Sequence, residues 1–517
     1  MTTKTNGFQN FSELREFIRR YNSTSVLEIG TKKCWQKLET KYSNSLSWVL
    51  GNAERNYAVR LMLLASAGNP YKQKNINAKV FDELVDIYHN WSKHTISDKH
   101  ILEEEAEILL CSIQEWEINH EKIVRNWSLK LSSILDSKVI SAHVKGLFVQ
   151  RLGAFQNAGF GHPVSRIKRA MKLVELIDKL SENELSNSFS DNVGLSSSTY
   201  FRQFLVCLDL FSRFSEKRGF CHFRSLPNMD DELRKLGVTQ ENLKLFIKQN
   251  SALFSSKNNA SFRSRVDDDL NIIPDFYQPF FYNHFLESPF VELKDEEFCL
   301  PDPFSFTESC WNGVMRLAIK SSHKEVEHLL SRAFEDYLEN ILFPFICAGS
   351  FEKIPIVKNS NSGKDKRADF LIKTNVSYIL VECKNSVMST ATSAYFKADK
   401  LADVWCRIHS AFEQIGRTAE ALNLYDKPVI PLVLTFYDSI AASVVFEEMV
   451  KQTSYCSYMK LNMLPVVYSL HEFEHWISHR SRDNWSELIL SKQTNASSVQ
   501  PDNKGHSYGH LDNISIL

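Results

Sequence analysis

Two charged residues stand at the end of an apolar segment that is typical of a buried strand. In "VSYILVECKN", Glu382 and Lys384 are two residues apart, so both side chains lie on one face of the strand. Asp369 opens the preceding strand-like segment, "RADFLIKT". Adjacent strands can bring Asp369 and Glu382 together. Two carboxylates that converge at strand ends suit Mg²⁺ or Mn²⁺, with the backbone carbonyl of Cys383 as a further metal ligand.

Lys384 would lie beside such a metal ion. A lysine there can orient or help deprotonate an attacking water and can offset charge on a phosphorus-centred transition state. A divalent metal polarises the phosphate and lowers the pKa of its bound water. These residue types therefore predict metal-assisted phosphodiester hydrolysis. The alternative is that Glu382 and Lys384 form an exposed salt bridge of little energetic weight.

The segments around these residues predict an α/β domain. A helical pattern over 323–346 is followed by strand-like segments at 351–359, 367–374 and 376–385. A second helical pattern covers 393–422, and strand-like segments at 427–437 and 464–470 come after it. This αβββαβ order predicts a mixed sheet flanked by helices.

The residues and the order of elements resemble the PD-(D/E)xK nuclease superfamily, which has the restriction endonuclease-like fold. The resemblance places the first acidic residue at Asp369 and the ExK half at Glu382 and Lys384. It also implies that Glu335, on the preceding helix, lies near the metal, and that Gln414 is the glutamine of the following helix. Gln414 falls further beyond the lysine than is usual, and Ala368 replaces the family's proline.

The resemblance implies a Mg²⁺- or Mn²⁺-dependent endonuclease that cleaves DNA, or RNA as a second choice, in a prokaryotic anti-phage defence or restriction system. A nuclease fold that only binds nucleic acid is the alternative. Residues 351–400 contain nine Lys or Arg against five Asp or Glu, which offers a local patch for phosphates. The contacts expected there are Lys364, Lys366 and Arg367.

Composition gives no further sign of a partner. The 517 residues carry 61 Lys plus Arg against 62 Asp plus Glu, so net charge favours neither nucleic acid nor a membrane. No apolar run is long enough for a signal peptide or a membrane span, and ten cysteines occur without a CxxC pair, so a cytoplasmic location is expected. A homo-oligomer and a phage-derived or partner-protein trigger are compatible with this organisation.

The spacing of apolar residues divides the chain into a helical half and a mixed α/β half. Residues 1–255 show mainly helical periodicity and predict a sensing, binding or assembly region. Polar residues then indicate a connecting segment over 256–315. The nuclease-like domain is expected over 316–492, and 493–517 form a polar tail.

A stretch of the helical half resembles the helix-turn-helix of AraC-type regulators. The resemblance rests on Val193 and Gly194 at the turn and on the Tyr200–Phe201 pair after a serine-rich start. It implies a helix in the DNA major groove. The alternative is a buried helix, because "FLVCLDLF" follows the pair. The expected phosphate contacts are Arg166, Lys168, Arg169 and Arg202.

A competing metal motif lies near the end of the mixed half. His471, Glu472 and His475 in "HEFEH" match the H-E-x-x-H pattern of zinc metallopeptidases. The motif opens its helix, however, where Ser469 and Glu472 indicate a capping box instead. The tail histidines, His506 and His510, could also bind metal, although solvated side chains are the simpler interpretation.

Overall fold

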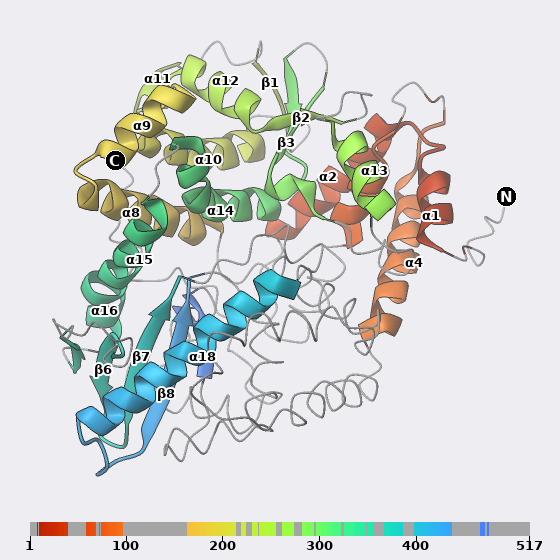
Figure 1. Cartoon of the computed structure of the whole chain (residues 1–517). Coiled ribbons are helices and arrows are strands. Elements are labelled where there is room, and N and C mark those ends of the chain that lie inside the picture. Colours follow the sequence, from red (N-terminus) through yellow and green to blue (C-terminus); the bar gives the residue numbers. More distant parts are fainter. Residues whose placement is uncertain are drawn as a thin grey trace. The chain divides into compact units, whose positions relative to one another are not determined.

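Two sheets, one in each of two compact units, organise the computed structural model of this chain (Figure 1). Among the described residues, those up to Val326 belong to unit 1 and those from Glu327 onward to unit 2. The structure describes residues 8, 10–39, 58–68, 72, 74–96, 163–213, 219–223, 230–235, 237–254, 261–272, 282–293, 296–321, 325–347, 350–355, 367–385, 398–436, 466–470 and 473–474.

Unit 1 combines helices with a small sheet. Its helices are α1 (Phe11–Ile18), α2 (Ser23–Glu39), α4 (Ala78–Ile96), α8 (Pro163–Leu180), α9 (Glu184–Val193), α10 (Ser197–Arg213), α11 (Asp230–Lys235), α12 (Gln240–Gln249), α13 (Phe262–Ile272), the 3₁₀ turn η4 (His284–Leu286) and α14 (Pro303–Ser321). Its strands are β1 (Phe220–His222), β2 (Ser251–Leu253), β3 (Phe290–Glu292) and β4 (Glu297–Cys299), in the order β1-β4-β3-β2.

The expected connecting segment, 256–315, is placed inside unit 1 rather than between two domains. It contributes α13, β3, β4 and most of α14. Strand β3 pairs with both β2 and β4, and β4 pairs with β1, so the segment completes the sheet. Helix α14 packs on α8, α9 and α10. The polar start of this segment therefore does not mark the end of a domain.

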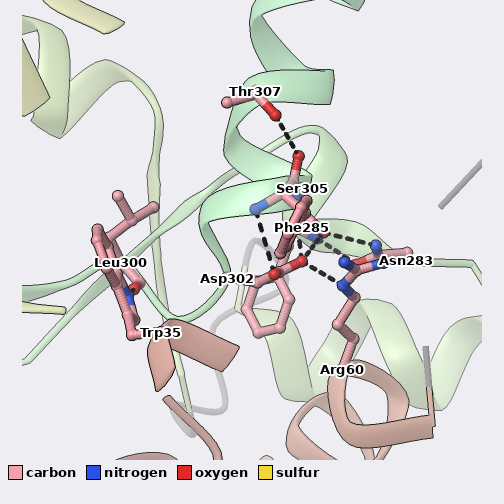
Figure 2. Close-up of polar contacts among 9 residues, drawn as sticks. Trp35, Arg60, Asn283, Phe285, Leu300, Asp302, Ser305 and Thr307 are labelled. Carbon is pink, nitrogen blue, oxygen red and sulfur yellow. Dashed lines mark hydrogen bonds and ion pairs between the residues drawn. The ribbon is translucent and has the colours of Figure 1, made fainter. Parts of the chain in front are cut away.

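A buried polar network fixes the start of α14 (Figure 2). Asp302 accepts hydrogen bonds from the backbone N–H of Ser305 (2.9 Å) and of Phe304 (3.3 Å), which caps the helix. Asp302 also forms an ion pair with Arg60, and both side chains are almost completely buried. Asn283 Nδ2 donates to Ser305 Oγ at 2.9 Å. The network ties three distant parts of unit 1 together.

Replacing Asp302 with alanine is expected to destabilise the protein by about 3–5 kcal/mol, because Arg60 would lose its ion-pair partner in a buried setting. The free energy of unfolding from denaturant titration measures this loss. Asp82→Ala is the matched control, since Asp82 pairs with Lys33 (2.8 Å) near the surface and should contribute only about 0–1 kcal/mol. Equal losses in the two variants would contradict the assigned role of the network.

Unit 2 is built on a five-stranded mixed sheet in the order β5-β6-β7-β8-β9. Strands β5, β6 and β7 are antiparallel neighbours, whereas β7, β8 and β9 run parallel. The strands are β5 (Phe351–Lys353), β6 (Phe370–Lys373), β7 (Tyr378–Lys384), β8 (Val429–Thr435) and β9 (Val466–Ser469). The helices are α15 (Val326–Tyr337), the π-helical turn η5 (Leu338–Leu342), α16 (Phe343–Cys347) and α18 (Ala398–Ala421).

Helices pack against this sheet through apolar side chains. Helix α18 lies along β7 and β8 (Figure 1). Phe334 of α15 contacts Phe436 just after β8, and Phe343 of α16 contacts Phe370 of β6, with ring centroids 5.5 and 5.1 Å apart. The mixed α/β architecture expected for this half is confirmed, and each of the five strand-like segments contains one strand. Within the described residues, no helix has both the length and the apolar character needed to span a membrane.

Candidate metal centre

The β6–β7 hairpin places the two predicted carboxylates at the same end of adjacent strands. The antiparallel register pairs Phe370 with Val381, and Asp369 directly precedes this first pair. Asp369 N donates to Val381 O at 3.0 Å and Asp369 Oδ2 accepts from Cys383 N at 2.7 Å, so Asp369 contacts the residues on both sides of Glu382. The hairpin therefore brings Asp369 and Glu382 together as the sequence predicted.

Glu382, Lys384 and Gln414 form a contiguous hydrogen-bonded group. Lys384 Nζ lies 2.5 Å from Glu382 Oε1, and the Glu382 side chain is almost fully buried while that of Lys384 is partly exposed. In the amide orientation that satisfies its neighbours, Gln414 Nε2 donates to Glu382 Oε1 (2.6 Å) and Gln414 Oε1 accepts from Lys384 Nζ (3.2 Å). Gln414 thus belongs to this group, and the length of α18 accounts for its distance from the lysine in sequence.

Electrostatic coupling links these strands to Glu335 on α15. Burial, followed by the negative charge of Asp369, raises the pKa of Glu382 to about 8. The same two causes raise the pKa of Glu335 to about 7. Burial also raises the pKa of Asp369, against the effect of a 2.7 Å hydrogen bond from Cys383 N to Asp369 Oδ2. Burial is therefore the largest cause at all three carboxyl groups, and the negative charge of Asp369 adds to it at Glu382 and Glu335.

Lys353 is a second lysine at the edge of this acidic group. Its Nζ lies 2.8 Å from Glu339 Oε2 and 3.7 Å from Glu335 Oε2. The π-helical turn that contains Glu339 directly follows α15, and such turns recur at functional sites. Lys353 was expected only as one of several basic residues of the patch, so its contact with Glu335 is a finding of the structure.

An unsatisfied oxygen marks where a cation would fit. Glu382 Oε2 is buried and has no hydrogen-bond partner. Leaving a buried carboxylate oxygen unpaired is costly, and a divalent cation with oxygen ligands would satisfy it. Within the described part of the chain, no three Asp, Glu, His or Cys side chains already form a compact metal-binding cluster. Asp369 and Glu382 are the carboxylates best placed to hold a metal, with Glu335 as the third.

Cys383 is suited to offer its backbone carbonyl rather than its sulfur. Burial, then the negative charges of Asp369 and Glu382, raises the pKa of the Cys383 thiol well above its ordinary value. A thiol that stays protonated is a poor metal ligand, since the thiolate is the binding form. The carbonyl of Cys383 therefore stays a predicted ligand.

Two of the expected phosphate contacts in unit 1 are contradicted by their burial. Arg166 is buried and forms an ion pair with Glu308 of α14. Arg169 is also buried, with its guanidinium carbon 5.2 Å from the centre of the Trp311 ring. Both arginines hold α8 to α14, so neither can reach a nucleic acid without unpacking the core.

The other predicted contacts have different positions. Lys168 and Arg202 are partly exposed, and Arg202 lies against Gly237, where an added Cβ would come within 2.4 Å of its Nη1. Arg367 is partly exposed two residues before Asp369, which leaves it available to a phosphate at the candidate site. Lys364 and Lys366 lie outside the described residues.

The AraC-like stretch folds as consecutive helices, but its second helix is buried. Gly194 ends α9 with a left-handed φ of 77°, as the turn requires. Tyr200 and Phe201 are buried, and Tyr200 Oη donates to Asn250 Oδ1 at 2.8 Å. Over residues 197–212 of α10, only Ser198 is exposed. A recognition helix needs an exposed face. Packing is therefore the better interpretation of this motif.

The three HEFEH residues, His471, Glu472 and His475, lie outside the described residues, as do the tail and its His506 and His510. Within the motif, Phe473 and Glu474 are described and both are buried. Glu474 Oε1 accepts a 2.6 Å hydrogen bond from Tyr337 Oη of α15. This part of the motif serves the packing of unit 2.

Sequence reasoning missed Thr418, which contacts the backbone directly before Asp369. Ala368 N donates to Thr418 Oγ1 at 2.8 Å. A signal for it existed, because Thr418 follows Gln414 by four residues and so lies on the same face of the helix.

Comparison with known proteins identifies no relative: no family model, curated protein or solved structure matches this chain.

Proposed function

We propose that this chain is a metal-dependent nuclease of the PD-(D/E)xK type, which hydrolyses phosphodiester bonds in DNA. The carrying observation is that Asp369 and Glu382 lie close together at the end of the β6–β7 hairpin, beside Lys384, and that Glu382 Oε2 is buried and unsatisfied. A salt bridge alone would not require a second carboxyl group facing the first. The order of helices and strands in unit 2 supports the same assignment.

Each side chain has a role in this proposal. Asp369 and Glu382 hold the metal from two strands, with Glu335 as a third carboxylate. Lys384, released from Glu382 by metal binding, orients the attacking water and faces the phosphate. Gln414 holds the side chains of Lys384 and Glu382 in position by a hydrogen bond to each. A bound Mg²⁺ supplies polarisation of the scissile phosphate and a lowered pKa of its water.

The test is cleavage of supercoiled plasmid DNA by purified protein with Mg²⁺ or Mn²⁺, with EDTA as the control. We expect nicking or linearisation that Asp369→Ala and Lys384→Ala each abolish. Cleavage that persists in both variants would contradict the assignment. Single-stranded RNA, as a second substrate, separates a ribonuclease from a DNase. His475→Ala should leave cleavage unchanged, and loss of activity in that variant alone would favour the zinc site.

Binding of DNA without cleavage by the wild-type protein would support the non-catalytic alternative. The acidic group argues against that alternative on physical grounds. A surface that only binds nucleic acid gains nothing from three carboxyl groups, which repel phosphate. The proposed role in anti-phage defence rests on the family resemblance.

A further inference from the structure

Thr418 joins helix α18 to the backbone that leads into β6, directly before Asp369. The side chain is fully buried, as is Ala368, the residue directly before Asp369. Thr418 Oγ1 accepts from Ala368 N at 2.8 Å and donates to Gln414 O at 2.7 Å. A threonine hydroxyl has one proton to donate and lone pairs to accept, so both bonds form at once.

The hydrogen bond between Ala368 N and Thr418 Oγ1 holds a residue that the strand pairing of the sheet does not hold. Ladder pairing of β6 begins at Phe370, so Ala368 lies just before the strand. A buried backbone N–H at that point needs an acceptor, and Thr418 provides it. The bond fixes the backbone immediately before Asp369, whose carboxylate is oriented by Cys383 N.

The same helix also holds the other half of the candidate site. Gln414, one turn before Thr418, contacts both Glu382 and Lys384. The Thr418 hydroxyl bonds to the carbonyl of Gln414, so the two contacts are directly connected. Helix α18 therefore spans the two strands, with Thr418 at the start of β6 and Gln414 at the end of β7.

We propose that Thr418 is a positioning residue that sets Asp369 relative to Glu382 through α18. This inference rests on the proposed nuclease function, since it assigns Thr418 to the metal site of that function. Its effect is on metal affinity, because two carboxylates must keep a fixed separation to bind one ion. Thr418 touches neither the metal nor the substrate.

The test is Thr418→Val, which keeps the shape and removes the hydrogen bond. We expect Mn²⁺ affinity, measured by calorimetry without nucleic acid, to fall about 10–100-fold, as for other residues that orient metal ligands. The metal concentration for half-maximal cleavage should rise by the same factor. Thr418→Ser keeps the hydroxyl and should restore most of the affinity. Unchanged affinity in Thr418→Val would overturn the proposal.

Thr374→Val is the control for a general loss of stability. Thr374 Oγ1 accepts from Ser377 N (2.9 Å) in the turn at the other end of the same hairpin. This variant should lower the melting temperature without changing Mn²⁺ affinity. If Thr418→Val does not fold, Thr418→Ser and Thr418→Ala take its place, and equal affinities in those two would overturn the proposal. A wild-type protein that neither binds Mn²⁺ nor cleaves DNA would instead refute the proposed function.

Discussion

Replacing Glu382 with glutamine is expected to abolish metal-dependent cleavage and, above pH 8, to stabilise the metal-free protein. Glutamine has the same shape and can still accept from Lys384, but it cannot supply a charged ligand. The loss of cleavage should exceed about 100-fold, the upper range for residues that only support a ligand. The opposite signs of the two effects would identify Glu382 as a residue kept for function at the expense of stability.

The gain in stability follows from the burial of Glu382. Its folded-state pKa is about 8 against an ordinary value of 4.5, chiefly because burial disfavours the charged form. Above pH 8 the wild-type side chain is ionised in a buried site, whereas glutamine stays neutral. Each kcal/mol that the substitution adds to the free energy of unfolding should raise the melting temperature by about 2–4 °C for a unit of this size.

Thermal unfolding in EDTA at pH 6 and pH 9 measures this gain, which should be larger at pH 9, where the loss of stability caused by Glu382 is complete, than at pH 6, where it is only partial. Glu413→Gln is the matched control, because Glu413 lies on α18 with its carboxylate near the surface, paired with Arg417 at 3.3 Å. That variant should change neither cleavage nor the pH dependence of stability. A lower melting temperature for Glu382→Gln at pH 9 would show that the charge of Glu382 stabilises the metal-free fold.

Local patterns predicted unit 2 better than unit 1. The strands of unit 2 are apolar segments bounded by turn residues, and the alternation in β7 correctly placed Glu382 and Lys384 on one face. The strands of unit 1 have three residues each, too few for alternation to be visible. They are held by pairing between distant segments, such as β1 with β4, which no local pattern reveals.

The buried arginines show that local sequence patterns also fail to reveal the distant partners of single residues. Judged from the neighbouring sequence alone, Arg166 and Arg169 look like solvent-facing residues of a basic helix that is suited to binding phosphate. Their partners, Glu308 and Trp311, are more than a hundred residues away on α14. Thr418 was missed for a related reason, because its partner is a backbone N–H that only the folded sheet places beside it.

Affinity for Mn²⁺ is expected to rise steeply with pH, because the carboxyl groups of the candidate site must lose protons before they bind metal. With a pKa of about 8, Glu382 is about 1% ionised at pH 6 and half ionised at pH 8. Glu382 alone should therefore increase affinity about 50-fold over this range, and Glu335, with a pKa of about 7, adds to the effect.

The stability of the metal-free protein should change in the opposite direction. Glu382 and Glu335 have folded-state pKa values above their ordinary value of 4.5, so the folded state holds more protons than the unfolded state. Their contribution to stability is fully present below about pH 4.5 and is lost as pH rises through 7 and 8. Bound Mn²⁺ removes this loss. The rise in melting temperature on adding Mn²⁺ should thus be larger at pH 8 than at pH 6.

Titration calorimetry at several pH values, in buffers with different ionisation enthalpies, measures both the affinity and the protons released. We expect about one proton or more to leave per Mn²⁺ bound at pH 7. Glu335→Gln should remove the part of the profile centred near pH 7 and retain the rise toward pH 8, which belongs to Glu382. Affinity that stays constant between pH 6 and pH 8 would mean that the acidic group is already ionised without metal, and the unsatisfied Glu382 Oε2 would then need another explanation.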